Sequence, residues 1–223
     1  MRGREPFADR AQAGAALAGR LASYAGRADV LVLALPRGGV PVAAPVAAAL
    51  RVPLDVLVVR KLGVPEQPEL AMGALAGIGG GVEEVLNRRV LAAARVPEAD
   101  LAEVRVTELA ALRRREQALR RELPPLPVEG RVVVVVDDGA ATGSTVRAAV
   151  AALRRHSAAR VVVALPVCPP DTAAALARET DELVCLRVPA TFRAVGLEYA
   201  DFEPPADADV LALLRASRAR GVS

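Results

Sequence analysis

The stretch VVVVVDDGAATGST, residues 132–145, decides the fold of this chain. Its five successive valines are β-branched, and such a run favours a strand that is buried on both faces at the centre of a parallel sheet. Open α/β sheets bind their ligands in the crevice beyond the carboxyl ends of the strands. We therefore expect the functional site directly after Val136.

The rest of the chain alternates between short apolar runs and longer segments, rich in Ala, Leu and Arg, with helical spacing. This alternation predicts a doubly wound α/β fold with a mainly parallel sheet. The Gly- and Pro-rich segment 60–81 predicts a loop with at most one short hairpin. The other expected strands are 30–35, 54–60, 161–165 and 183–188, and the expected helices are 7–25, 40–50, about 97–119, one from about residue 144, and 208–216.

Composition disfavours several classes of function. The 29 basic and 26 acidic residues nearly balance, which argues against a surface that coats polyanions, and an aromatic content of 2% leaves few rings to stack on nucleic-acid bases. The arginines at 113–115, 120 and 121 are interpreted as a solvated helix face. No apolar run is long enough to span a bilayer, so we expect a cytoplasmic protein without a membrane or nucleic-acid partner.

Zinc sites and Cys/His nucleophiles are also disfavoured. The only histidine is His156, in an Arg-rich helical stretch, and Cys168 and Cys185 lie in apolar segments without a CxxC spacing. We interpret the two thiols as buried or half-buried and the histidine as solvated.

The loop after the valine strand contains the parts of a sugar-phosphate site. A helix that begins at about Ser144 would direct backbone N–H groups at a phosphate, with hydroxyl donors from Thr142 and Thr145. Asp137 and Asp138 can accept hydrogen bonds from a vicinal diol and help to hold a hydrated Mg²⁺ nearby. A Walker A loop would need a Lys after the second glycine, and a dinucleotide fingerprint would need three spaced glycines, so neither class of protein is favoured.

This stretch resembles the motif of type I phosphoribosyltransferases that binds phosphoribosyl pyrophosphate (PRPP): a hydrophobic strand, two acids and a small-residue loop rich in Gly and Thr. The resemblance implies a fold of the type I phosphoribosyltransferase kind. It also implies that Asp137 and Asp138 bind the ribose 2- and 3-hydroxyls of PRPP. The residues implied to bind the 5-phosphate are Gly139, Ala140, Ala141, Thr142, Gly143, Ser144 and Thr145.

Two further segments are placed like the family's pyrophosphate-binding elements. PRGG, residues 36–39, follows the first predicted strand, where Arg37 would add a fixed cation and the glycines would allow a strained peptide, including a cis one. An ordinary strand-to-helix turn is the alternative. Lys61, after Arg60, is the only lysine among 29 basic residues, and its compact ammonium group suits a phosphate oxygen. Chance is the alternative explanation for this single lysine. The implied pyrophosphate-binding residues are Pro36, Arg37, Gly38, Gly39, Arg60 and Lys61, and the implied catalytic residues are Asp137, Asp138, Arg37 and Lys61.

Two more stretches extend the resemblance over most of the chain. RKLGVPEQPELAMGALA, from Arg60, is similar to a subgroup of phosphoribosyltransferases whose acceptor is unassigned, and Glu69 and Gly73 would belong to a lid or to a structural loop. VPATFRAVGLEYADF, residues 188–202, resembles the base-binding segment of hypoxanthine-guanine enzymes, although its spacing is one residue shorter and no lysine stands upstream. The implied base-binding residues are Phe192, Val195, Gly196 and Leu197, with Glu198 as a metal contact, and a merely buried Phe192 is the alternative.

The resemblance predicts an enzyme that displaces pyrophosphate from Mg-PRPP by a nitrogenous, purine-like base, with Mg²⁺ as cofactor. It implies one domain over residues 1–223, with a helical insertion at about 82–127 and hood elements at about 1–25 and 189–223, and it is compatible with a homo-oligomer. A regulatory protein that senses PRPP or a nucleotide without turnover is the main alternative. A sugar-phosphate hydrolase is a weaker one, because it needs a general base that His156 is poorly placed to supply.

Overall fold

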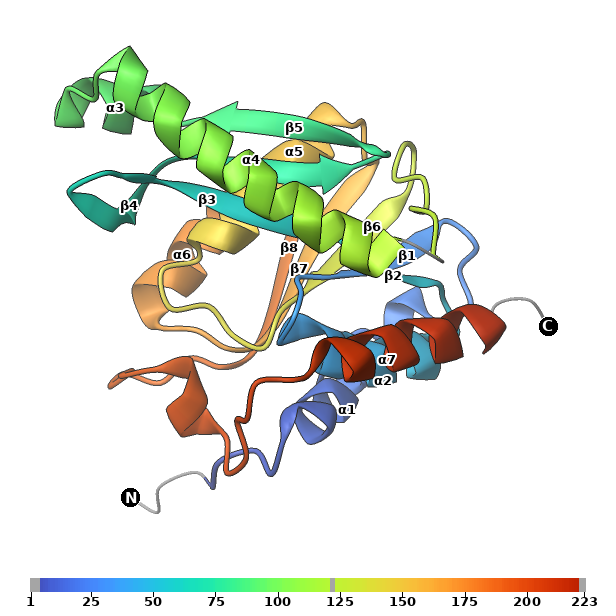
Figure 1. Ribbon diagram of the computed structural model, residues 1–223. Coiled ribbons are helices and arrows are strands. Elements are labelled where there is room, and N and C mark those ends of the chain that lie inside the picture. Colours follow the sequence, from blue (N-terminus) through green and yellow to red (C-terminus); the bar gives the residue numbers. More distant parts are fainter. Residues whose placement is uncertain (1–4, 121–122, 221–223) are drawn as a thin grey trace.

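The computed structural model describes residues 5–120 and 123–220 and contains two β-sheets (Figure 1). The larger sheet is parallel, with the strand order β2-β1-β6-β7-β8. The predicted α/β fold with a mainly parallel sheet is therefore confirmed. Its strands are β1 (Val30–Ala34), β2 (Leu54–Val56), β6 (Val132–Val136), β7 (Arg160–Val167) and β8 (Glu182–Arg187).

Strand β6 lies at the centre of this sheet, as its five valines predict. Every one of them is buried, and Val134 pairs with Val32 of β1 on one side and with Val162 of β7 on the other. Successive side chains point to opposite faces of a strand, so alternate valines contribute to two separate cores.

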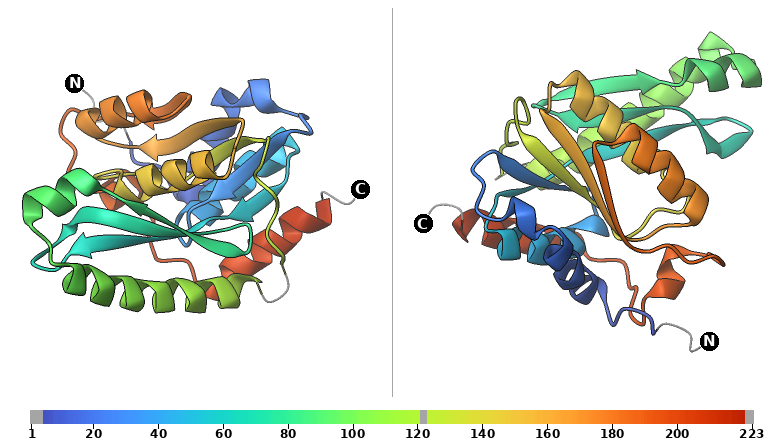
Figure 2. Two further views of the ribbon diagram at one scale, coloured as in Figure 1. Left: turned by 90° about the horizontal axis from the view of Figure 1, so that it is seen from above. Right: turned by 180° about the vertical axis from the view of Figure 1, so that it is seen from behind.

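Helices cover both faces of the parallel sheet (Figure 2). Three of them, α1 (Arg10–Arg20), α2 (Gly39–Leu50) and α7 (Asp207–Arg220), pack on the core that contains Val134. Helices α5 (Ser144–Arg155) and α6 (Pro170–Glu179) pack on the core of the opposite face. The carboxyl ends of β1 and β6 lie side by side, at the edge of the sheet where ligands bind in such folds.

The smaller sheet shows that the prediction of a loop at 60–81 was wrong. β3 (Val58–Val64), β4 (Gln67–Ile78) and β5 (Gly81–Leu86) form an antiparallel sheet in that order. The glycines that suggested a loop serve close packing instead. A Cβ on Gly63 would lie 2.6 Å from the carbonyl oxygen of Pro68, and one on Gly73 would lie 2.8 Å from that of Val85.

The predicted strand at 54–60 is divided between the two sheets. β2 ends at Val56 and β3 begins at Val58, so the chain leaves the parallel sheet at Leu57. At the far end of the small sheet, Gly79 and Gly80 adopt φ angles of 61° and 83°, which lets β4 turn tightly into β5.

Two helices follow the small sheet within the segment predicted as a helical insertion. α3 (Arg88–Ala94) is short, and α4 (Glu98–Arg120) confirms the long helix predicted from the apolar spacing of 97–119. α4 runs across the small sheet and buries Leu101, Leu112 and Leu119 (Figure 1). No helix within the described ranges combines the length and apolar character needed to cross a membrane.

Segments 5–9 and 189–206, far apart in sequence, lie against each other at one end of the molecule (Figure 2). The Phe7 N–H donates to the Glu198 carbonyl at 2.8 Å, and the Ala200 N–H donates to the Phe7 carbonyl at 2.7 Å. The Tyr199 ring contacts the rings of both Phe7 and Phe202, with centroid distances of 5.6 Å and 5.1 Å. These ring contacts hold the short helix η2 (Val195–Glu198) near the carboxyl ends of the parallel strands.

The two cysteines lie on neighbouring strands, with Cys168 just after the end of β7 and Cys185 within β8. Cys168, after β7, is buried, and Cys185, in β8, is half-buried, as their apolar surroundings predicted. Their sulfur atoms are 3.3 Å apart, and both thiols are free.

Candidate functional site

Asp137 and Asp138 follow β6 directly and are half-buried at the carboxyl edge of the parallel sheet. The Asp138 N–H donates to Asp137 Oδ1 at 2.9 Å. Burial raises the pKa of Asp137 well above its ordinary value, and the neighbouring charge of Asp138 adds to the rise. Burial also raises the pKa of Asp138, against the opposing effect of Arg10. Adjacent carboxyl groups with raised pKa values at a strand end are typical of a binding site.

The PRGG turn, between β1 and α2, packs directly against this pair. A Cβ on Gly38 would lie 2.0 Å from Asp138 Oδ2, and a Cβ on Gly39 would lie 2.7 Å from the Val136 carbonyl oxygen. Any other residue at either position would displace the turn or the acids. A cis peptide bond, which the sequence predicted at the glycines of this turn, lies just before them, between Pro36 and Arg37.

The loop from Gly139 to Gly143 connects the acid pair to α5. Gly143 adopts a left-handed φ of 70° immediately before the helix, and the Thr172 hydroxyl donates to the Ala141 carbonyl at 2.7 Å, which fixes the loop from α6. The Ser144 N–H makes a long hydrogen bond of 3.4 Å to Thr142 Oγ1. The N-cap residue Gly143 has no side chain to accept a hydrogen bond, so among the described residues the first-turn N–H groups that follow Ser144 remain available to an anion.

Arg10, in the first turn of α1, completes this site and was not predicted. Its Nε donates to Asp138 Oδ2 at 2.8 Å, its Nη1 donates to the Glu203 carbonyl at 2.9 Å, and its side chain is only 10% exposed. The guanidinium also lies 3.8 Å from the centroid of the Phe202 ring. Tyr199 adds a second tie, because its hydroxyl donates to the Asp138 carbonyl at 2.6 Å. Residues from α1 and from the segment after β8 thus hold Asp138 directly.

The segment expected to bind a base, residues 192–197, packs against the 139–143 loop at Gly139. Val195 contacts the loop, since a Cβ on Gly139 would lie 2.6 Å from Val195 Cγ1. Leu197 is 67% exposed, and Phe192 is half-buried. Gly196 packs against the Phe202 ring and not against Phe192. A Cβ on Gly196 would lie 2.7 Å from Phe202 Cδ1.

Glu198 was predicted to contact a metal. Its carboxylate lies 3.7 Å from Arg187 Nη1, whose guanidinium stacks 3.5 Å from the centroid of the Phe7 ring. The part of the chain that the structure describes has no group of three or more His, Cys, Asp or Glu side chains that could hold a metal ion.

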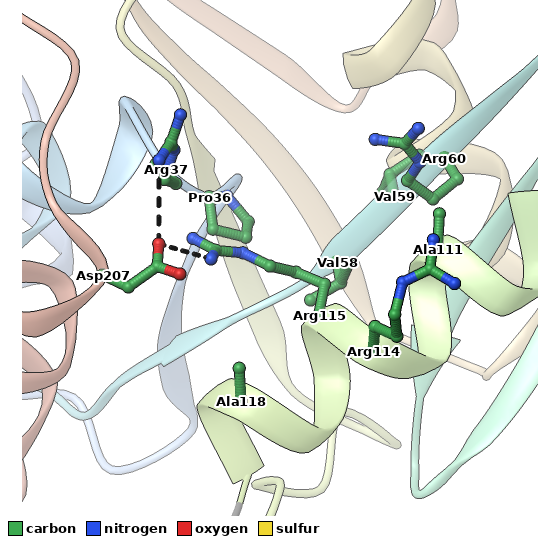
Figure 3. A pocket seen from close by; sticks show the side chains of 10 residues that line it. All are labelled: Pro36, Arg37, Val58, Val59, Arg60, Ala111, Arg114, Arg115, Ala118 and Asp207. Atoms are coloured by element: carbon green, nitrogen blue, oxygen red, sulfur yellow. Dashed lines mark hydrogen bonds and ion pairs between the residues drawn. The ribbon is translucent and has the colours of Figure 1, made fainter.

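Arg37 lines a cavity of about 430 Å³ between the PRGG turn, β3 and α4 (Figure 3). Arg60 lines the same cavity and forms an ion pair of 2.7 Å with Glu108 of α4. Side chains alternate along a strand, so Lys61 lies on the opposite face of β3, the face of Val59. The structure therefore does not bring Arg60 and Lys61 together as one basic pair.

The arginines of α4 are not simply a solvated helix face. Arg114 and Arg115 line the cavity beside Arg37, and Arg120 donates to the buried Asp55. Arg113 and Arg114 are exposed as expected, Arg115 and Arg120 are half-buried, and residue 121 lies outside the described residues. The sequence did contain a signal: residues 111, 114, 115 and 118 share one helical face, with alanine at both ends of the set.

Comparison with known proteins agrees with this arrangement. Residues 7–199 match the phosphoribosyl transferase domain family. Two Mycobacterium tuberculosis proteins, from strains CDC 1551 / Oshkosh and H37Rv and both named "Putative phosphoribosyl transferase", are 50% identical over 208 residues, which is 93% of this chain and 46% of theirs. This chain spans about half the length of those curated relatives.

A crystal structure supports the same relationship over the whole fold. The protein TT1426 from Thermus thermophilus is 43% identical, with a TM-score of 0.83 over 94% of this chain and 97% of that chain. The family match extends from the hood residue Phe7 through the acid pair to Tyr199. The chain therefore belongs to the phosphoribosyl transferase domain family.

Proposed function

We propose that this domain transfers a phosphoribosyl group from PRPP to a nitrogenous base and releases pyrophosphate. The observation that carries the proposal is the packing of the PRGG turn on the acid pair, where Gly38 approaches Asp138 too closely for any side chain to fit. The turn and the pair of carboxylates thereby meet at the carboxyl ends of β1 and β6, where open α/β sheets bind ligands. Membership of the family supports the same activity.

In the proposed reaction, an acceptor nitrogen forms a bond to C1 of the ribose as the bond from C1 to the pyrophosphate oxygen breaks. The pyrophosphate leaves with the electron pair of that bond, and the nitrogen loses its proton. Because such transfer has oxocarbenium character, positive charge develops on the sugar and negative charge on the leaving oxygens. The site should therefore act by electrostatics and positioning rather than through a covalent intermediate.

The chain's own residues divide this work between three elements. Asp137 and Asp138 would accept hydrogen bonds from the ribose hydroxyls, and the first turn of α5, with Thr142, would hold the 5-phosphate. Arg37 would offset charge on the leaving group from within the PRGG turn. Lys61, on the face of β3 toward the α5 core, stays a second candidate for that role.

Mg²⁺ fits this site, held partly by protein and partly by ligand and water. Asp137 and Asp138 offer carboxylate oxygens, and the described residues add no third acidic side chain to form a complete cage. Mg²⁺ usually keeps several waters and joins one or two carboxylates to substrate phosphates, so two carboxylates suffice. Bound there, the ion would neutralise charge on the departing pyrophosphate.

The proposal is tested by incubating the protein with Mg²⁺, PRPP and a panel of free purines and pyrimidines, and measuring nucleotide by mass spectrometry alongside released pyrophosphate. We expect equal amounts of both products with one base or a small group of bases, and neither product from the Asp137→Asn, Asp138→Asn double variant. PRPP binding without product from any base would overturn the transferase proposal in favour of the sensing alternative.

The proposed location is the cytoplasm.

A further inference from the structure

The cavity beside the PRGG turn holds more positive charge than its surroundings balance. Four guanidinium groups line it, those of Arg37, Arg60, Arg114 and Arg115 (Figure 3). Among the described residues, two carboxylates pair with them: Glu108 with Arg60, and Asp207 with both Arg37 and Arg115. Four positive and two negative groups leave an excess of two positive charges in one concave space, which favours a multivalent anion.

One face of α4 builds the wall opposite the turn. Ala111 and Ala118 stand one helical turn to either side of Arg114 and Arg115, so small side chains leave the space that the two arginines border. Arg114 forms no ion pair within the described ranges. Arg115 Nη2 is buried without a hydrogen-bond partner, although a buried donor normally has one. Because Asp207 holds Arg115 Nη1, an anion that displaces Asp207 would free the guanidinium to turn and give Nη2 a partner.

Asp207, the first residue of α7, sits between two of the arginines. Its carboxylate lies 3.8 Å from Arg37 Nη1 and 2.5 Å from Arg115 Nη1, and its side chain is 52% exposed. Ion pairs at such exposure contribute little net stability, so a stronger anion can displace this carboxylate. Figure 3 shows it on the Arg37 side of the cavity, while Arg60 and Arg114 face the other side.

We propose that α4 and α7 complete the diphosphate site expected at Arg37 and Arg60: Arg114 and Arg115 are further anion-binding residues, and Asp207 is an internal anion that the ligand displaces. Planar guanidinium forks match phosphate oxygens in pairs, which suits four arginines to two linked phosphates. The identity of the ligand rests on the proposed function, because Arg37 belongs both to the PRGG turn and to the cavity.

The first test is calorimetric titration with inorganic pyrophosphate at fixed magnesium concentration. The Arg114→Gln, Arg115→Gln double variant should bind at least about tenfold more weakly than the parent, since each lost charge-assisted hydrogen bond has an effect of that order. Arg113→Gln is the matched control, because Arg113 neighbours the pair on α4 but stands exposed outside the cavity. Unchanged affinity in the double variant, or an equal loss in the control, would overturn the proposal.

The second test addresses Asp207. Removing a competing anion should tighten pyrophosphate binding, so Asp207→Asn is expected to bind several-fold more tightly than the parent. Asp209→Asn removes the same charge from the same first turn of α7 and should leave the affinity unchanged. Weaker or unchanged binding by Asp207→Asn would show that the carboxylate does not occupy the ligand's place. Circular dichroism of each variant checks that the fold is retained.

The nucleotide assay separates a failure of this proposal from a failure of the transferase proposal. If the arginine double variant keeps both the parent's pyrophosphate affinity and its nucleotide formation, the cavity proposal fails and the transferase proposal stands. If pyrophosphate binding requires the arginines but no base yields a nucleotide, the transferase proposal fails and the cavity still binds diphosphate.

Discussion

Two carboxylate sites in the parallel sheet differ in how completely their oxygens are satisfied. At the first, in β2, Asp55 is 2% exposed, and four donors surround its two oxygens. They are the N–H groups of Val56 and Leu126 and the guanidinium groups of Arg120 and Arg218. This carboxylate has no capacity left for a ligand, and it joins β2 to α4 and α7.

At the second site, after β6, the four oxygens of Asp137 and Asp138 receive two hydrogen bonds from the described residues. One comes from the Asp138 N–H and the other from Arg10. Burial raises the pKa of both acids, so the fold places charge there at a cost that few protein donors offset. The fully bonded Asp55 therefore has a structural role, whereas the half-buried pair with free acceptor positions is suited to a ligand.

The largest expected effect falls on the structural site. Asp55→Asn removes the charge that neutralises two arginines, and it should lower the free energy of unfolding by about 3–5 kcal/mol. Urea unfolding measures the loss. Asp29→Asn is the control, because its pair with Arg27 is half-exposed, and it should cost at most about 1 kcal/mol. Similar losses in the two variants would remove the distinction.

Gly38→Ala, unlike Asp55→Asn, should act mainly on ligand binding. Its Cβ would lie 2.0 Å from Asp138 Oδ2, so the acid pair must shift, and PRPP affinity should fall about a hundredfold, or ~2.7 kcal/mol. The free energy of unfolding should fall by about 1–3 kcal/mol, as for an overpacked site. Calorimetry and thermal unfolding measure the two effects. PRPP affinity equal to the parent's would contradict the placement of ligand at the acid pair.

Glu116 of α4 is intermediate between the two sites, because its Oε2 lies 3.5 Å from Arg120 Nε and its other oxygen is unpaired among the described residues. Its Oε1 is buried without a partner, and burial raises its pKa above the ordinary value of 4.5. The folded state therefore binds this proton more tightly than the unfolded state, so stability should fall as the pH rises above that value. As the pH is raised above 4.5, the melting temperature should decline less steeply for Glu116→Gln than for the parent. Glu103→Gln, an exposed change on the same helix, should reproduce the parent's slope.

The smallest effect is expected at a glycine that has no packing role. A Cβ on Gly19 of α1 would meet nothing within 4 Å, so Gly19→Ala should stabilise the protein by about 0.5–1 kcal/mol through helix propensity. Chemical denaturation measures this gain, and PRPP affinity should not change. A loss of stability would show that the geometry around the glycines does not predict their roles.

The local parts of the fold and site could be predicted from sequence because their signals are contiguous. A run of valines, two acids and a small-residue loop leading into a helix form one strand-turn-helix unit, and each piece has a short-range cause. The PRGG turn follows the same logic. Its contact with Asp138 is not local, and it became evident only when parallel pairing of β1 with β6 placed both strand ends together.

The missed features depend on contacts between distant residues. Arg10 reaches Asp138 across 128 positions, and nothing near Arg10 in the sequence distinguishes it from the other arginines. The small sheet was missed for a different reason, because glycines at 63 and 73 that permit close backbone approach were interpreted as loop formers. The α4 arginines had a helical pattern that indicated a shared face, but the sequence did not show what that face bordered.

Calorimetric titration of the protein with PRPP, with and without Mg²⁺, tests whether Asp137 and Asp138 form the ligand site. We predict magnesium-dependent binding by the parent and by Asp29→Asn, and its loss in the Asp137→Asn, Asp138→Asn double variant, with the melting temperature of the double variant close to the parent's or higher. Binding that survives in the double variant, or a parent that does not bind PRPP at all, would contradict the assignment of the acid pair as the ligand site.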